Sequence, residues 1–133
     1  MNLATPRLLL LTHGTVGQAM LDTAERILGP VDGAVVLSNV EMSGKELTQR
    51  MEEMLESREP NTWLVVVVDM ACGSCWTAAQ MGAREKSRVA LLSGINLPML
   101  LTYFNKRDMV PVKQLVESMQ KAAQIGIAGV INR

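Results

Sequence analysis

The sequence has 133 residues, and its 13 basic and 13 acidic side chains cancel to a formal net charge of zero. Hydrophobic residues make up 48% of the chain and charged residues 20%, which excludes an intrinsically disordered protein and predicts one folded domain over residues 1–133. The balanced charge argues against a nucleic-acid-binding protein, because such proteins carry a strongly basic surface.

The longest apolar runs, at residues 8–11 and 64–68, are far shorter than the roughly 18 to 20 residues that span a bilayer. The N-terminal segment lacks a small-residue cleavage site, so it is a poor match to a signal peptide. Two cysteines are too few for a disulfide framework in a domain of this size. These features predict a cytoplasmic protein that does not insert into a membrane.

Four short runs rich in Leu, Val and Ala predict buried β-strands, at residues 8–11, 35–37, 64–68 and 89–92. Each run is nearly continuous instead of alternating with polar residues, as expected where both faces of a parallel sheet are covered. Residues 129–132 indicate a short fifth strand, which at the chain end would lie at a sheet edge or between subunits.

Capping motifs and prolines predict where the helices begin. Residues 15–18 resemble a capping box that opens a helix ended by Gly29-Pro30, and residues 43–46 form a second such box. Pro98 and Pro111 suit the first turns of two later helices. The alternation of strands and helices predicts an α/β fold, with helices on both faces of a doubly wound, mainly parallel sheet.

Two unusual loops follow the first and third strands, at residues 12–15 and 69–75. In the commonest small doubly wound order, 2-1-3-4, these strands are neighbours, and ligands bind beyond their carboxyl ends. The pattern therefore predicts that His13, which is the only histidine of the chain, faces Asp69.

This pairing has a chemical meaning. One nitrogen of a neutral imidazole attacks phosphorus while the other donates to a carboxylate, and the backbone N–H groups of Gly14, Gly73 and Ser74 would attract the phosphoryl charge. The structural alternatives are a His13 that only fills its loop, an Asp69 that only ends a turn, and a Ser74 that caps the following helix.

The segment Cys72-Gly73-Ser74-Cys75 has three interpretations. A C-x-x-C pair at a helix start supports dithiol exchange, and with His13 the two thiols would supply three metal ligands. The simplest interpretation is that both cysteines pack as small apolar side chains under a tight loop.

Three segments resemble the IIA proteins of the mannose family of the bacterial phosphoenolpyruvate-dependent sugar phosphotransferase system (PTS), and they occur in the same order as in that family. They are residues 11–14, residues 68–74 followed by Ala78-Ala79, and residues 93–100. The resemblance covers nearly the whole chain and identifies a single IIA-type phosphocarrier domain.

The resemblance implies that His13 accepts a phosphoryl group from the phosphohistidine of the carrier protein HPr and passes it to a separate IIB protein, with Asp69 orienting the ring. It implies no cofactor or metal beyond the covalent phosphoryl group, and a homodimer in which a last, antiparallel strand, here residues 129–132, is exchanged. The residues expected to hold the phosphoryl group are Gly14, Thr15, Cys72, Gly73 and Ser74.

The chain departs from the family pattern in the aspartate loop. Cys72 stands in place of a glycine, Cys75 in place of a proline, and Met70 where a hydroxyl residue is common. Other functions consistent with the sequence are a thiol-redox or metal-responsive module built on Cys72 and Cys75, and the phosphotransfer subunit of a dihydroxyacetone kinase. The sugar, and the choice between transport and regulation, are not encoded in these motifs.

Overall fold

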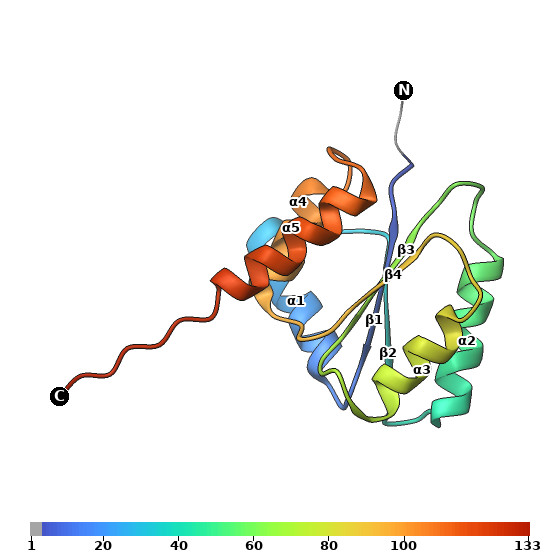
Figure 1. Ribbon diagram of the computed structural model, residues 1–133, viewed down its shortest axis with the longest axis horizontal. Helices are drawn as coiled ribbons and strands as arrows, with labels where there is room; N and C mark the ends of the chain where they lie inside the picture. Colours follow the sequence, from blue (N-terminus) through green and yellow to red (C-terminus); the bar gives the residue numbers. More distant parts are fainter. Residues whose placement is uncertain (1–3) are drawn as a thin grey trace.

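A four-stranded parallel sheet lies at the centre of the computed structural model, which describes residues 4–133 (Figure 1). The strands are β1 (Arg7–Thr12), β2 (Ala34–Ser38), β3 (Leu64–Val68) and β4 (Val89–Leu92). Their order is β2-β1-β3-β4, and all neighbouring pairs are parallel. The four predicted parallel strands, their predicted order and the α/β fold class are therefore confirmed.

Helices cover both faces of this sheet, as expected. One face carries α1 (Val16–Leu28), α4 (Leu97–Lys106) and α5 (Val112–Ile125), and the other carries α2 (Gly44–Glu56) and α3 (Gly73–Ala83). The chain reverses direction across the sheet after β2, so right-handed crossovers place α1 on one face and α2 and α3 on the other.

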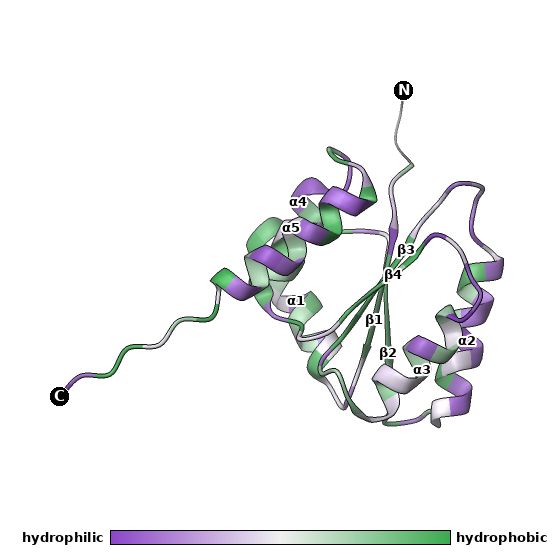
Figure 2. Cartoon of the chain, in the orientation of Figure 1, coloured by the Kyte–Doolittle hydropathy of each residue, from purple (hydrophilic) through white to green (hydrophobic). Residues whose placement is uncertain are grey.

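The two central strands divide their side chains between two apolar cores. Leu8 and Leu10 pack with α1, α4 and α5, whereas Leu9 and Leu11 pack with α2 and α3. Every residue of β3 is buried, and the strands in Figure 2 are apolar along their length while polar residues lie on the helices. Burial on both faces is the physical reason that these strands are continuous in Leu and Val.

The structure corrects the expected capping of α1. Thr15 occupies the N-cap position but makes no side-chain cap hydrogen bond. Instead, the buried Thr12 hydroxyl at the end of β1 accepts a hydrogen bond of 2.8 Å from the backbone N–H of Gly17. The first turn of α1 is therefore fixed to the strand that precedes it.

Other helix starts are closer to expectation. The Ser43–Glu46 capping box forms at α2, and Pro98 lies in the first turn of α4. Pro111 occupies the N-cap of α5, one residue before the helix, and α3 is preceded by Cys72 at the N-cap instead of Ser74.

The C-terminal residues do not form the expected fifth strand. Residues 127–133 follow α5 without regular secondary structure and are exposed, and Figure 1 shows them running away from the sheet. An edge strand needs a neighbouring strand as hydrogen-bonding partner, and this segment is not paired with β2 or β4 within the single chain.

Candidate functional site

The candidate site lies at the carboxyl end of the sheet, where β1 and β3 run side by side. Leu11 of β1 pairs with Val68 of β3, so the residues that follow each strand leave the sheet next to one another. His13 follows β1 and Asp69 follows β3. The sheet thus brings together two residues that lie 56 positions apart in the sequence.

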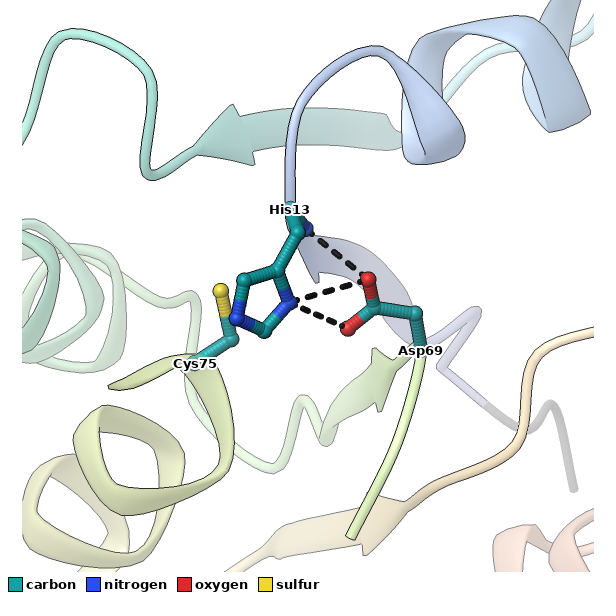
Figure 3. A group of neighbouring side chains, drawn as sticks. All are labelled: His13, Asp69 and Cys75. Carbon is teal, nitrogen blue, oxygen red and sulfur yellow. Dashed lines mark hydrogen bonds and ion pairs between the residues drawn. The ribbon is translucent and has the colours of Figure 1, made fainter. Parts of the chain in front are cut away.

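Asp69 holds both the backbone and the ring of His13 (Figure 3). The backbone N–H of His13 donates to Oδ2 of Asp69 at 3.0 Å, and Nδ1 of the ring lies 3.0 Å from each carboxylate oxygen. A carboxylate is acceptor-only, so Nδ1 carries the hydrogen and donates it. In the neutral form of the ring, the lone pair is then on the other nitrogen, Nε2. The expected approach of His13 to Asp69 is confirmed.

The pair is half-buried, with 28% of the His13 side chain and 15% of the Asp69 side chain exposed. Burial alone raises the pKa of Asp69, but the hydrogen bonds from the His13 amide and ring, together with the charge of the ring, outweigh it and hold that pKa below its ordinary value. Asp69 is therefore ionised at neutral pH.

Gly73 faces the free nitrogen of the ring. A Cβ atom at this position would lie 3.2 Å from Nε2 of His13, and the backbone φ of Gly73 is +85°. Glycine adopts this left-handed conformation without the steric cost that other residues meet. The absence of a side chain keeps the approach to Nε2 open.

Gly73 also begins α3, an 11-residue helix, so the unsatisfied N–H groups of the first turn lie near the ring. Cys72 at the N-cap and Ser74 in the first turn are both exposed. Among the expected phosphoryl-binding residues on this loop, the structure thus brings Gly73 to the imidazole and leaves Cys72 and Ser74 at the helix N-terminus beside it.

On the His13 loop, Gly14 and Thr15 are exposed. The backbone N–H of Gly14 is already bonded to Oδ1 of Asn39 at 3.0 Å, and its carbonyl accepts from the hydroxyl of Ser38 at 2.7 Å. Sequence reasoning did not identify Ser38 and Asn39 as site residues. Their signal is position alone, because Ser38 ends β2 and Asn39 follows it, and β2 is the other neighbour of β1.

The two cysteines lie in different environments. Cys72 is exposed and Cys75 is buried, and both are free thiols. Burial raises the pKa of the Cys75 thiol, and the neighbouring charge of Asp69 raises it further. The interpretation of small apolar cysteines therefore applies to Cys75 and is wrong for Cys72.

The sulfur of Cys75 also lies close to His13 and Asp69. One ligand atom from each of His13, Asp69 and Cys75 lies within 4.8 Å of the others. Figure 3 shows Asp69 on the Nδ1 side of the imidazole and Cys75 on the side of the other ring nitrogen. The metal-binding alternative from the sequence combined His13 with both cysteines, whereas in the structure the group that converges is His13, Asp69 and Cys75.

Two surface hollows flank the loops that hold His13. One, of about 590 Å³, lies between α2 and α3 and reaches Gly73 and Ser74. The other, of about 370 Å³, is bordered by Gly14 and Thr15. Each hollow is therefore bordered by residues of one of the two loops that meet at His13.

None of the helices in residues 4–133 combines the length and the apolar content needed to cross a membrane.

Comparisons with known proteins converge on one family. The model of the EIIA-man family, described as PTS system fructose IIA component, matches residues 7–120. The sorbose-specific EIIA component of the PTS from Klebsiella pneumoniae is 26% identical over 111 residues, which cover 84% of this chain and 82% of that protein. The mannose-specific EIIAB component of Escherichia coli is 28% identical over 120 residues, 90% of this chain but only 36% of that longer protein.

The fold matches solved structures as well. The crystal structure of the phosphotransferase system component EIIA from Streptococcus agalactiae superimposes with a TM-score of 0.83 at 21% identity, covering 92% of this chain and 95% of that one. At this level of identity the likeness supports the fold.

Proposed function

The chain belongs to the mannose-type family of PTS IIA components, and we propose that it is a phosphocarrier in which His13 accepts a phosphoryl group from phospho-HPr and passes it to a IIB protein. The observation that carries this proposal is the imidazole itself. Its Nδ1 is held by Asp69, and its Nε2 faces a glycine that leaves room for an incoming group.

The transfer step follows from this geometry. The lone pair on Nε2 of His13 attacks phosphorus, so a new N–P bond forms while the N–P bond of the donor phosphohistidine breaks and its electron pair returns to the donor ring. The His13 ring becomes cationic, and the ionised Asp69 stabilises that charge through Nδ1. Transfer to the IIB protein repeats the step with His13 as donor, and no resident metal or cofactor takes part.

The N-terminus of α3 is the proposed cradle for the phosphoryl oxygens. The proposal is supported by the position of Gly73, Ser74 and Cys72 at the N-terminus of α3, where Cys72 makes no side-chain cap hydrogen bond, because helix N-termini favour anions. Gly14 and Thr15, which follow His13 directly on the other loop, are the remaining proposed phosphoryl-binding residues. Because the N–H of Gly14 is bonded to Asn39, Gly14 contributes space instead of a donor.

The proposed partners are HPr and a IIB protein, both met through weak and fast interfaces, and they place the chain in the cytoplasm without nucleic-acid contact or membrane insertion. The names of two relatives describe a sorbose-specific and a mannose-specific PTS component. A subunit of a dihydroxyacetone kinase would use the same step but a different acceptor, which mixing with purified IIB protein distinguishes.

We also propose a homodimer. The C-terminal segment exposes three large apolar side chains, and β4 leaves one side of its hydrogen-bonding ladder free at the edge of the sheet. A second copy would satisfy both features by pairing residues 129–132 with that edge. The apolar side chains are Ile127, Val130 and Ile131.

The phosphocarrier proposal is tested with phosphoenolpyruvate, enzyme I and HPr. Wild-type protein is expected to gain one acid-labile phosphate per chain, and His13→Ala to gain none while keeping the circular dichroism of the wild type. Gln120→Ala, at an exposed position on α5 outside both hollows, is the control and is expected to be labelled normally. A label that persists in His13→Ala would refute the assignment.

The thiol-redox alternative is less well supported. Dithiol exchange needs a reactive thiolate, whereas burial and the Asp69 charge raise the pKa of Cys75. Because Cys75 is also buried, only Cys72 is open to an incoming partner, which disfavours dithiol exchange.

A further inference from the structure

The buried thiol beside the reactive pair has no part in the proposed transfer. Cys75 is fully buried at the start of α3, and its sulfur lies within 4.8 Å of a ligand atom of His13 and of Asp69. These three side chains come from the end of β1, the end of β3 and the first turn of α3, so the fold itself fixes their distances. Within residues 4–133 no other trio of His, Cys, Asp or Glu side chains converges in this way.

The three donor atoms match the preferences of one class of metal ion. An imidazole nitrogen, a carboxylate oxygen and a thiolate sulfur are the ligands of zinc, and zinc sites with three protein ligands keep a fourth position for water. A thiolate disfavours magnesium and calcium, which take oxygen ligands. Since 28% of the His13 side chain is exposed, an ion can reach the cluster from that side.

Closing the three side chains around one ion requires them to move. Zinc bonds of roughly 2.0 to 2.3 Å in a tetrahedron put neighbouring ligand atoms about 3.3 to 3.6 Å apart. The ligand atoms lie within 4.8 Å of one another, so an ion would draw the widest pair together by on the order of 1 Å. Asp69 and Cys75 flank opposite nitrogens of the ring, so they would also have to turn toward the same one. Asp69 can contribute Oδ1 to the ion while Oδ2 keeps its hydrogen bond from the His13 amide.

We propose that His13, Asp69 and Cys75 form a binding site for zinc or a similarly soft divalent cation, and that this ion excludes the phosphoryl group. The exclusion, which rests on the proposed function, follows from the imidazole. A neutral ring has one nitrogen lone pair in its plane. An ion on Nε2 occupies the attacking atom, and an ion on Nδ1 forces the proton to Nε2, so neither form is nucleophilic.

Exclusion is reciprocal. A phosphoryl group on Nε2 removes the imidazole from the ligand set, so the phosphorylated chain is expected to bind zinc much more weakly than the free chain. The site therefore acts as a switch between an ion-bound, idle form and a form that carries phosphate. The chain contains one histidine and two cysteines, so few other side chains compete for zinc in a binding measurement.

The experiment titrates zinc into the purified full chain, without a histidine tag, against a chromophoric chelator and in a non-thiol reductant. We expect one zinc per chain, with a dissociation constant on the order of 1 µM or lower. Cys75→Ser and His13→Ala should each weaken binding about tenfold or more. Cys72→Ser is the matched control, because that thiol is exposed, and should bind zinc like the wild type.

Cobalt replaces zinc in a second measurement that reports the ligand directly. A thiolate-to-cobalt charge-transfer band is expected in the wild type and in Cys72→Ser and should be absent from Cys75→Ser. The proposal is overturned if zinc does not bind below about 100 µM, if Cys75→Ser binds as tightly as wild type, or if the band depends on Cys72. Circular dichroism, with Cys75→Ala as second variant, checks that a loss is not unfolding.

A third measurement links the ion to transfer. Zinc should slow labelling by phospho-HPr in the wild type, and slow it less in Cys75→Ser when each protein is compared with its own zinc-free rate. Equal sensitivity of both proteins would refute the exclusion. The binding measurements use neither HPr nor phosphate. A chain that binds zinc but takes no phosphate therefore refutes the proposed function alone, and a chain that takes phosphate but binds no zinc refutes the metal site alone.

Discussion

The site contains two pairs of chemically distinctive residues that the fold treats in opposite ways. His13 and Asp69 are separated by 56 positions and yet form three contacts of 3.0 Å. Cys72 and Cys75 are three positions apart, and one is exposed while the other is buried. Strand pairing therefore predicts that His13 and Asp69 meet, whereas closeness in sequence does not predict that Cys72 and Cys75 share an environment.

The difference has a geometric cause. Parallel strands in fixed register deliver the ends of β1 and β3 to one place, so two residues just beyond those ends meet. At the start of a helix, by contrast, successive side chains point in different directions. The N-cap Cys72 therefore faces solvent, while Cys75 in the first turn faces the core.

The strongest way to break the first pair is Asp69→Asn. The amide keeps the size of the side chain but carries no negative charge, so it neither fixes the ring tautomer as firmly nor stabilises the cationic ring. The rate of phosphoryl transfer from phospho-HPr should therefore fall about 100-fold. A rapid-quench assay with labelled phosphate measures this rate. Asp22→Asn, at an exposed position on α1, is the control and should accept the phosphoryl group at the wild-type rate. An unchanged rate in Asp69→Asn would reject the role proposed for Asp69.

Thr12→Val tests the support beneath the first pair. Thr12 is fully buried and its hydroxyl accepts the Gly17 N–H, so valine leaves that N–H without a partner and should reduce the free energy of unfolding by about 1–3 kcal/mol. Thr15→Val removes an exposed hydroxyl that caps nothing and should change it by less than about 0.5 kcal/mol. Urea denaturation measures both. Equal losses would show that Thr12 does not anchor the helix.

Thiol labelling sharpens the contrast within the second pair. With Cys72→Ser and Cys75→Ser as single-thiol proteins, the remaining Cys72 should react with a disulfide reagent at least about tenfold faster than the remaining Cys75, because Cys75 is buried and its pKa is raised. Denaturant should bring the two rates together. Similar rates in the folded proteins would contradict the observed burial.

The smallest expected effect is the acid dependence of the first pair. The pKa of Asp69 is lowered in the folded state, so the folded protein binds fewer protons there than the unfolded chain, whose Asp pKa is about 3.9. The stabilisation from this carboxylate is then complete above about pH 5 and is lost as the pH falls through the lower, folded-state pKa. The difference in unfolding free energy between wild type and Asp69→Asn should persist down to about pH 4 and narrow below it. A difference that closes above about pH 5 would show that the pKa of Asp69 is not lowered.

An NMR titration of the carboxyl carbon gives an independent check. Its midpoint should lie below about 3.9 in the wild type and move upward in His13→Ala, because the ring hydrogen bond and the ring charge are removed.

Much of the fold was predictable because burial leaves a direct trace in sequence. The four strands and the capping box at Ser43 depend on residues that are neighbours along the chain. The capping of α1 was predicted wrongly. Thr15 has a suitable residue type at the N-cap, but the hydroxyl that accepts from the first turn of the helix belongs to Thr12. The fifth strand was predicted from residues 129–132 alone, and a strand without a partner does not form.

Sequence by itself determined that a histidine and an aspartate follow two buried strands, because strand composition marks where each strand ends. Tertiary structure decided what surrounds them. Cys75, and not Cys72, lies beside the ring. Ser38 and Asn39 form hydrogen bonds with the loop that holds His13. Gly73, at the start of α3, lies next to Nε2. These outcomes depend on the directions of side chains from separate elements, which are fixed only when the helices pack on the sheet.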